Sequence, residues 1–215
     1  MCFSAGASFT AGAVLTAAGV ATVSQAKKKE TRLFSLIPLI FGIQQIAEGV
    51  IWLTLNNPGH YPGQSLFMYI FLAIADVVWP TFIPASIMLM EENPGKRKVL
   101  KYFVVSGAVV SLYYAICLAV FKTTPEILNC HINYKGTFIP ALMVPMFLLY
   151  LISTITPFFI SGIRGMKWLG LAMFISVLVS VIFYFKNITS VWCFFAAVIS
   201  VIVFVIIKKE NPRTT

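Results

Sequence analysis

Long uninterrupted apolar stretches dominate this chain and restrict it to folds that suit a membrane. Its 215 residues are 59% hydrophobic and 11% charged, whereas soluble domains carry about 25% charged residues. A hydrocarbon core of about 30 Å needs about 20 apolar residues per helix. We predict helical spans at residues 2–24, 33–55, 65–90, 98–121, 138–161, 167–185 and 189–207. The expected fold is a single all-α domain of seven transmembrane helices over residues 1–208, followed by a short cytoplasmic tail at 209–215.

The basic residues are distributed unevenly over the predicted connections. Of the 16 Lys and Arg residues, 13 fall in alternate connections, within Lys27–Arg32, Lys96–Lys101, Arg164–Lys167 and Lys208–Arg213. Cytoplasmic loops of membrane proteins are enriched in Lys and Arg, so the pattern predicts an outside N-terminus and a cytoplasmic C-terminus. It also identifies the lipid bilayer, with anionic headgroups at the basic loops, as the expected partner. A nucleic-acid partner is not expected.

Glu48 is the first of two acidic residues inside the predicted spans. Gln45 and Trp52 share its helix face, and Gln44 lies one turn before it. An acidic side chain at the centre of an inserted helix costs roughly 2.5–3.5 kcal/mol, so it marks a pathway or a polar partner. Glu48 is therefore a candidate proton or cation acceptor facing the bundle interior. The alternative is a protonated Glu48 that hydrogen-bonds a hydroxyl of the first span, such as Ser8, and fixes helix packing.

Asp76 is the second acid, and the helical rise places it at a depth close to that of Glu48. Pro80, four residues later, lacks the N–H that would bond the Asp76 carbonyl in an α-helix. Irregular backbone is tolerated inside a membrane only where protein or a wet cavity satisfies it. Trp79 beside this break is either a packing residue or a ring that stacks on a ligand. Without a basic residue near the middle of any span, the acids should be neutral, share a proton or bind a cation.

The first predicted span carries a stripe of small and mildly polar residues. Ser4, Ser8, Gly12 and Thr16 recur every four residues and so share one helix face. Such stripes allow the backbones of membrane helices to approach closely. The stripe is therefore interpreted as a packing face, with the polar lining of a pore or pocket as the alternative.

A second group of reactive residues falls in the predicted outer segments. It contains Cys2, His60, Glu126, Cys130 and His131, which are metal-ligand types without ligand spacing. Three interpretations remain: a metal site, a disulfide between Cys2 and Cys130, or unrelated loop residues. His131 is also a candidate for capping a helix or closing the site above Glu48. The sequence predicts neither a resident metal nor a cofactor.

Four segments carry a resemblance to a known family. They are MCFSAGASFTAGAVL at the start, FGIQQIAEGVIWL in the second span, WPTFIP in the third and CHINY before the fifth. Together they resemble a family of small bacterial integral membrane proteins of unknown function that begin Met-Cys-Phe-Ser. The resemblance runs over roughly the first two-thirds of the chain. It implies a multi-pass protein of the bacterial cytoplasmic membrane and brings no activity.

The favoured function is a secondary transporter or channel-like carrier for a small solute or cation. In this hypothesis Glu48 accepts the proton or cation, and the proline-kinked third and fifth spans form the gate. One alternative is a non-catalytic sensor or assembly partner. Another is an intramembrane enzyme acting on a lipid or quinone, with Glu48 as acid or base and His131 nearby. A water-filled path through the bundle would favour the carrier, and a dry interior would favour the sensor or assembly partner. A lateral opening toward lipid at Glu48 would favour the enzyme.

Overall fold

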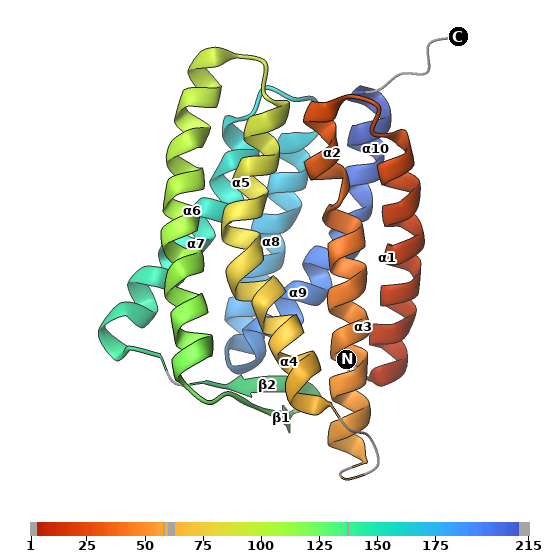
Figure 1. The fold of residues 1–215 in the computed structure, drawn as a ribbon, viewed down its shortest axis with the longest axis vertical. Helices are drawn as coiled ribbons and strands as arrows, with labels where there is room; N and C mark the ends of the chain where they lie inside the picture. Colours follow the sequence, from red (N-terminus) through yellow and green to blue (C-terminus); the bar gives the residue numbers. More distant parts are fainter. Residues whose placement is uncertain (1–3, 58, 60–62, 137, 211–215) are drawn as a thin grey trace.

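The computed structural model describes residues 4–57, 59, 63–136 and 138–210, and helices make up most of this part (Figure 1). The elements follow in the order α1 (Ala5–Gln25), α2 (Lys29–Ser35), α3 (Ile37–Asn56), α4 (Gln64–Leu72), η1 (Ala73–Val78), α5 (Trp79–Met90), α6 (Pro94–Val120), β1 (Thr124–Leu128), β2 (His131–Lys135), α7 (Pro140–Ile160), α8 (Met166–Tyr184), η2 (Phe185–Asn187), α9 (Ile188–Ile199) and α10 (Val201–Glu210). The fold is all-α apart from the β1–β2 hairpin.

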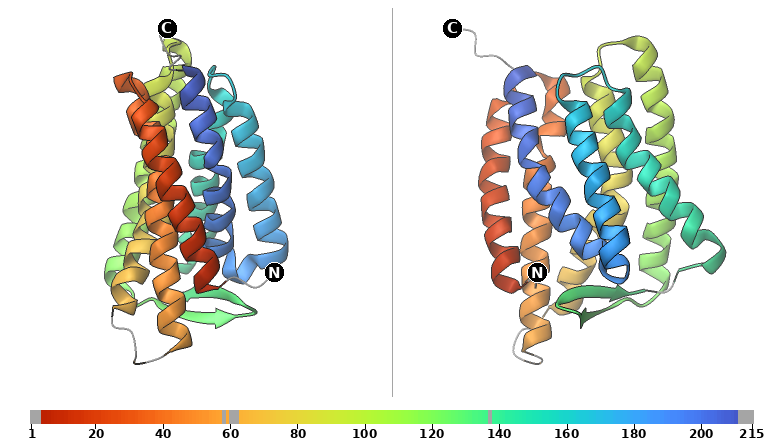
Figure 2. Two further views of the ribbon diagram at one scale, coloured as in Figure 1. Left: turned by 90° about the vertical axis from the view of Figure 1, so that its right-hand side faces the viewer. Right: turned by 180° about the vertical axis from the view of Figure 1, so that it is seen from behind.

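Six continuous helical stretches of the described chain are long and apolar enough to cross a membrane. They cover Ala5–Gln25, Lys29–Asn56, Gln64–Met90, Pro94–Val120, Ala141–Ile160 and Met166–Glu210. The last of them has 45 residues and contains both the sixth and the seventh predicted spans. It reverses direction at η2, where the polar residues Lys186 and Asn187 interrupt the apolar run, and α9 packs back against α8 (Figure 2). These lengths and compositions are those of an integral membrane protein.

Helix α1 packs against α3 through the small-residue stripe. Ser8 and Gly12 are buried there. A Cβ placed on Gly12 would lie 2.7 Å from Ile46 Cγ1, and one on Gly42 would lie 2.8 Å from the Thr16 backbone nitrogen. Only glycine permits such an approach, so the packing interpretation of the stripe is confirmed.

The two ends of the bundle differ in their sequences. The α1–α2, α5–α6 and α7–α8 connections and the end of α10, which hold most of the basic residues, lie at one end, here called the basic end (Figures 1 and 2). The β1–β2 hairpin, η2, the end of α3 and the start of α4 lie at the other, here called the hairpin end. The predicted grouping of the basic connections therefore corresponds to one physical face.

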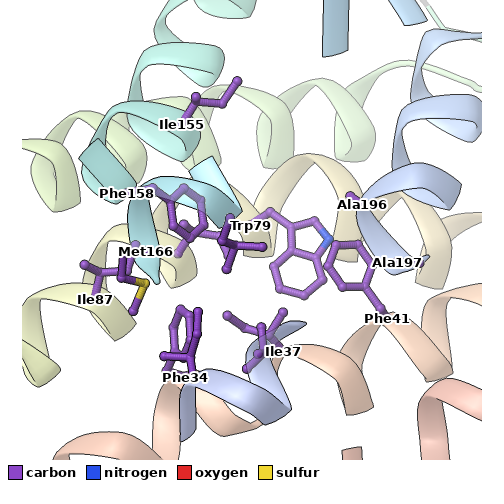
Figure 3. Packing of buried hydrophobic residues seen from close by; sticks show 14 of the residues in the cluster. Phe34, Ile37, Phe41, Trp79, Ile87, Ile155, Phe158, Met166, Ala196 and Ala197 are labelled. Atoms are coloured by element: carbon purple, nitrogen blue, oxygen red, sulfur yellow. The ribbon is translucent and has the colours of Figure 1, made fainter. Parts of the chain in front are cut away.

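Large apolar side chains pack together in the interior of the bundle (Figure 3). Phe34 and Ile87 are fully buried, and Phe158 is 2% exposed. The rings of Phe41 and Trp79 stack with centroids 4.2 Å apart and so join α3 to α5. This part of the protein is closed by packing.

The connection between α6 and α7 contains an antiparallel hairpin, which the expected all-α fold did not include. Asn129 and Cys130 have φ angles of 49° and 62° at its tip. Positive φ at both central residues is the geometry of a two-residue hairpin turn. Lys135 also forms a 2.7 Å ion pair with Glu126. Turn geometry and cross-strand pairing thus fold a segment whose composition indicated only a connection.

Candidate functional site: a cavity beside Asp76

The helix carrying Asp76 widens into a π-helical segment, η1, just before α5. The Trp79 N–H bonds the Ile74 carbonyl, five residues back. In this register the Ala75 carbonyl would pair with the N–H of residue 80, and Pro80 has none. The irregularity lies where the sequence predicted it, and in this register Pro80 leaves the carbonyl of Ala75 without its helical partner. The change of register is the physical reason, and π-helical turns frequently occur at functional sites.

Two hydroxyl groups from neighbouring helices bond the carbonyls of this π segment. Tyr150 Oη of α7 donates to the Ala75 carbonyl at 2.6 Å, and Ser111 Oγ of α6 donates to the Val77 carbonyl at 2.6 Å. Buried backbone acceptors need such partners where water is absent. The segment that carries Asp76 is therefore held between α6 and α7.

A cavity of about 390 Å³ lies beside this segment, at the hairpin end. Its volume falls within the range of ligand sites, about 300–1,000 Å³. Its walls come from η1, α6, β2, α7, η2 and α9, and aromatic residues make up much of them. Those aromatic residues are Tyr113, Tyr114, Tyr134, Phe138, Phe147, Tyr150, Phe185 and Trp192.

The cavity opens sideways between α7 and η2. Met143 and Val144 of α7 line it and are 49% and 57% exposed, and Phe185 of η2 lines it and is 68% exposed. Lys186, also in the lining, is exposed at the same place. The first turns of α7 lie apart from α8 in the right-hand view of Figure 2. The exposed lining residues thus mark the opening of the cavity, and most of them are apolar.

Asp76 lies in the cavity wall and has neither a hydrogen bond nor an ion pair within the described residues. Its electrostatic neighbours include Tyr114, Tyr150 and Cys193. Tyr134 of β2 belongs to the same surroundings. Burial, and after it the nearby Glu48, Cys193 and Asp76, raise the pKa of Tyr134 well above its usual value. The Tyr134 phenol therefore lies within electrostatic reach of both intramembrane acids.

Glu48 belongs to a separate buried cluster. It is 2% exposed, and Ser190 Oγ of α9 donates a hydrogen bond to its Oε1. Gln44 Oε1 accepts from Trp79 Nε1 at 3.0 Å, which joins α3 to α5. Gln45 is fully buried and lies close enough to Glu48 to interact with it. Its side-chain nitrogen and oxygen nevertheless have no well-formed hydrogen bond within the described residues. The predicted inward-facing acid with its glutamines is thus present, and Glu48 does not line the cavity beside Asp76.

The hydroxyl partner of Glu48 comes from the last helical stretch rather than the first. Ser8 is 1% exposed against α3, and no hydrogen bond joins it to Glu48 within the described residues. Helix α9, within the seventh predicted span, crosses the bundle and contributes Ser190, Trp192 and Cys193 to its interior (Figure 1). The sequence places these three residues in an apolar run, but it does not show that their side chains face the bundle interior.

A second cavity, of about 40 Å³, lies toward the basic end. Its walls are almost wholly apolar and include Phe41 and Trp79. Tyr150, Trp192 and Cys193 line both this cavity and the larger one. The rings of Tyr150 and Trp192 meet edge to face, with centroids 5.5 Å apart. These three side chains form the common wall between the cavities.

The second group of predicted residues is not assembled into a centre by the described chain. His131 Nδ1 lies 2.6 Å from the Asn129 carbonyl, and its ring contacts Tyr184. Cys130 is exposed at the hairpin tip, whereas Cys2 and His60 fall outside the described residues. Pairing of Cys2 with Cys130 thus stays a prediction. Within residues 4–57, 59, 63–136 and 138–210 there is no group of three His, Cys, Asp or Glu side chains able to hold a metal ion.

Comparison with known proteins assigns the chain to a family without assigning an activity. A family model described as "Family of unknown function (DUF6629)" matches residues 1–215. No match was found among curated proteins or among solved structures. The predicted resemblance to a family of unknown function is confirmed, and it extends over the whole chain rather than the first two-thirds. The chain belongs to the family of unknown function DUF6629.

Proposed function

We propose that the protein is a secondary carrier of a small solute in the bacterial cytoplasmic membrane. In this proposal seven helices cross the bilayer, with the hairpin end outside and the basic end in the cytoplasm. The chain reversal at η2 supports a seventh crossing, because α8 and α9–α10 run in opposite directions. The gathering of basic connections at one end supports the orientation. The Met-Cys-Phe-Ser start and the other matching segments support the bacterial origin.

One observation carries the proposal. A solute-sized cavity is lined by Asp76, which has no hydrogen bond or ion pair within the described residues, and it shares three lining side chains with a second cavity. Beyond Tyr150 and Trp192 lie the smaller apolar cavity and the buried apolar cluster that contains Phe41, Ile83 and Phe158. Alternating-access carriers bind substrate near the middle of the bilayer, often where helices are interrupted, and expose the site to one side at a time. In this proposal the sideways opening between α7 and η2 is where the solute enters the cavity.

Glu48 is the proposed proton acceptor of the carrier. It is buried, has no basic partner within the described part of the chain, accepts a hydrogen bond from Ser190, and lies close to Cys193 and Tyr134 at the cavity. Proton binding there would change the hydrogen bond that joins α3 to α9, and α9 supplies two of the three residues in the common wall. The site geometry favours this role over acid–base catalysis on a lipid or quinone, since neither Glu48 nor His131 lines the cavity.

Cys193 provides a native reporter for the test. A variant with Cys2, Cys117 and Cys130 replaced by Ala keeps Cys193 as its one thiol. Right-side-out and inside-out vesicles would be treated with a membrane-impermeant methanethiosulfonate, and modification measured by mass spectrometry. A carrier predicts reaction from the outside and slower reaction from the inside. Reaction from the outside alone indicates a sensor or binding protein, and no reaction from either side contradicts a water-filled solute pathway to the cavity. Cys193→Ala in the same background is the control.

A further inference from the structure

We infer that the ligand of the cavity beside Asp76 carries an ammonium group on an apolar body. This inference rests on the proposed binding of a solute in that cavity and names its chemical class. It draws on three features of the cavity: an unpaired carboxyl group, a row of aromatic rings and an opening between helices toward the membrane.

The carboxyl group determines the sign of the ligand charge. Asp76 is in the cavity wall without a hydrogen bond or ion pair in the described chain. An ionised carboxylate in such surroundings is costly unless a counter-ion accompanies it. A bound ammonium group would provide that counter-ion. It would bring its own N–H donors, or, if quaternary, a charge that needs no hydrogen-bond acceptor.

The aromatic rings determine the shape and polarity of the ligand. Phe138, Tyr114, Tyr150 and Trp192 all line the cavity. They form a continuous row of edge-to-face pairs, with centroid separations of 6.0 Å, 6.2 Å and 5.5 Å. Aromatic faces attract organic cations, and aromatic cages recognise quaternary ammonium groups.

The opening determines how the ligand arrives. Met143, Val144 and Phe185 line it and are exposed between α7 and η2, so an apolar body can enter from the lipid phase. Lys186 is exposed in this part of the lining, where it can meet an anionic group attached to the ligand. The ammonium can therefore belong to a free amphiphilic amine or to the headgroup of an aminolipid. The recognising chemistry at Asp76 is the same for both.

Three probes of matched shape test the charge preference. Benzyltrimethylammonium is the cation, neopentylbenzene is its uncharged isostere, and benzenesulfonate is an anion of similar size. Each would be titrated into the full chain, purified in a neutral detergent, with Trp fluorescence as the readout because Trp192 lies in the cavity wall. The cation is expected to bind at least tenfold more tightly than the isostere, and the anion is expected not to bind.

Substitutions at one carboxyl group connect that preference to Asp76. Asp76→Asn is expected to lose at least tenfold in affinity for the cation, and Asp76→Glu to recover part of it. Glu92→Gln, at an exposed residue of the basic end outside the cavity lining, is the control and should keep the wild-type affinity. Circular dichroism melts would establish that each variant is folded.

The outcomes separate this inference from the proposed carrier. Equal binding of the isostere, binding of the anion alone, or unchanged affinity in folded Asp76→Asn would overturn the ammonium assignment while leaving solute binding intact. Absence of binding by all three probes also overturns it, and Cys193 modification then decides separately whether a solute pathway exists. Repeating the titration in nanodiscs of phosphatidylglycerol, with and without phosphatidylethanolamine, distinguishes the sources. Competition by the aminolipid identifies a headgroup, and its absence identifies a free amine.

Discussion

The Tyr150 hydroxyl donates a 2.6 Å hydrogen bond to the carbonyl of Ala75, the residue before Asp76. This bond joins α7 to the π-helical segment and takes the place of the N–H that Pro80 lacks. Tyr150 also belongs to the wall shared by the two cavities. A shift of α7 would therefore act on both the backbone that carries Asp76 and the barrier between the cavities.

Tyr150→Phe removes the donor and leaves the Ala75 carbonyl buried without a partner. An unsatisfied buried acceptor costs about 1–3 kcal/mol. The variant should lower the midpoint of thermal unfolding in detergent, followed by Trp fluorescence. Tyr102 of α6 is 67% exposed, so Tyr102→Phe is the matched control and should leave the unfolding midpoint unchanged. Equal midpoints for the wild type and Tyr150→Phe would show that the bond contributes nothing.

Gly107→Ala tests the contact between α6 and the Pro80 break. A Cβ at Gly107 would overlap the Pro80 carbonyl, a backbone group that cannot rotate away. Overpacking of this kind costs about 1–3 kcal/mol or more, so lower folded yield and earlier unfolding are expected. Gly6→Ala, whose Cβ would meet only Ser4 Oγ at 3.9 Å, should be neutral or stabilising, since Ala favours helix. Fluorescence-detected size-exclusion chromatography of both variants measures the effect, and equal profiles would argue against the close approach.

Glu48→Gln and Glu48→Leu distinguish a proton acceptor from a packing residue. Gln keeps an oxygen that can accept from Ser190, so this variant should fold like the wild type and lose proton-coupled solute uptake in proteoliposomes. Leu leaves the Ser190 hydroxyl unsatisfied and should reduce stability by about 1–3 kcal/mol. Uptake by Glu48→Gln at the wild-type rate would limit Glu48 to a structural role.

Glu91 should make stability depend on pH at the basic end. Its Oε2 accepts from the Gly162 N–H at 2.7 Å and from Ser161 Oγ at 3.2 Å. Burial alone would raise the pKa of Glu91, but these bonds, one from the Asn93 N–H and the charge of Lys96 hold the pKa below its usual 4.5. A lowered folded-state pKa adds stability above about pH 4.5, and that stability is lost as the pH falls through the folded value.

Glu91→Gln should therefore unfold earlier than the wild type at pH 7, with a difference that shrinks as the pH approaches 3. Melts at intervals of half a pH unit, read by Trp fluorescence, give this profile. Glu92→Gln alters the neighbouring, exposed carboxyl group and should follow the wild-type curve. A constant difference between Glu91→Gln and the wild type at every pH would contradict the ionised role of Glu91.

Reporter fusions test the proposed orientation. Fusions at Gly59, Gly95, Lys122 and Thr215 should report outside, inside, outside and inside in turn, because basic connections stay in the cytoplasm. Alkaline phosphatase and green fluorescent protein report the two compartments. A periplasmic signal at Thr215 would contradict seven crossings, and reversed signals at all four positions would invert the proposed orientation.

Much of the fold could be predicted from the sequence, because length and apolarity alone decide which segments suit a bilayer. The close approach of α1 to α3 followed from the four-residue spacing of Ser8, Gly12 and Thr16, since that spacing defines one helix face. The break near Asp76 followed from Pro80, because a missing N–H is a covalent property. These features depend only on local chemistry and helical periodicity.

The partners across the bundle were decided only by the tertiary structure. Ser190 rather than Ser8 meets Glu48, because the reversal at η2 brings α9 through the interior, and no local signal encodes its path. The carbonyl released beside Pro80 belongs to Ala75, because packing against Tyr150 and Ser111 accommodates a π register. The cavity around Asp76 exists because α6, α7, β2 and α9 converge there. Its lining residues are far apart in the sequence, and only folding gives them a common surface.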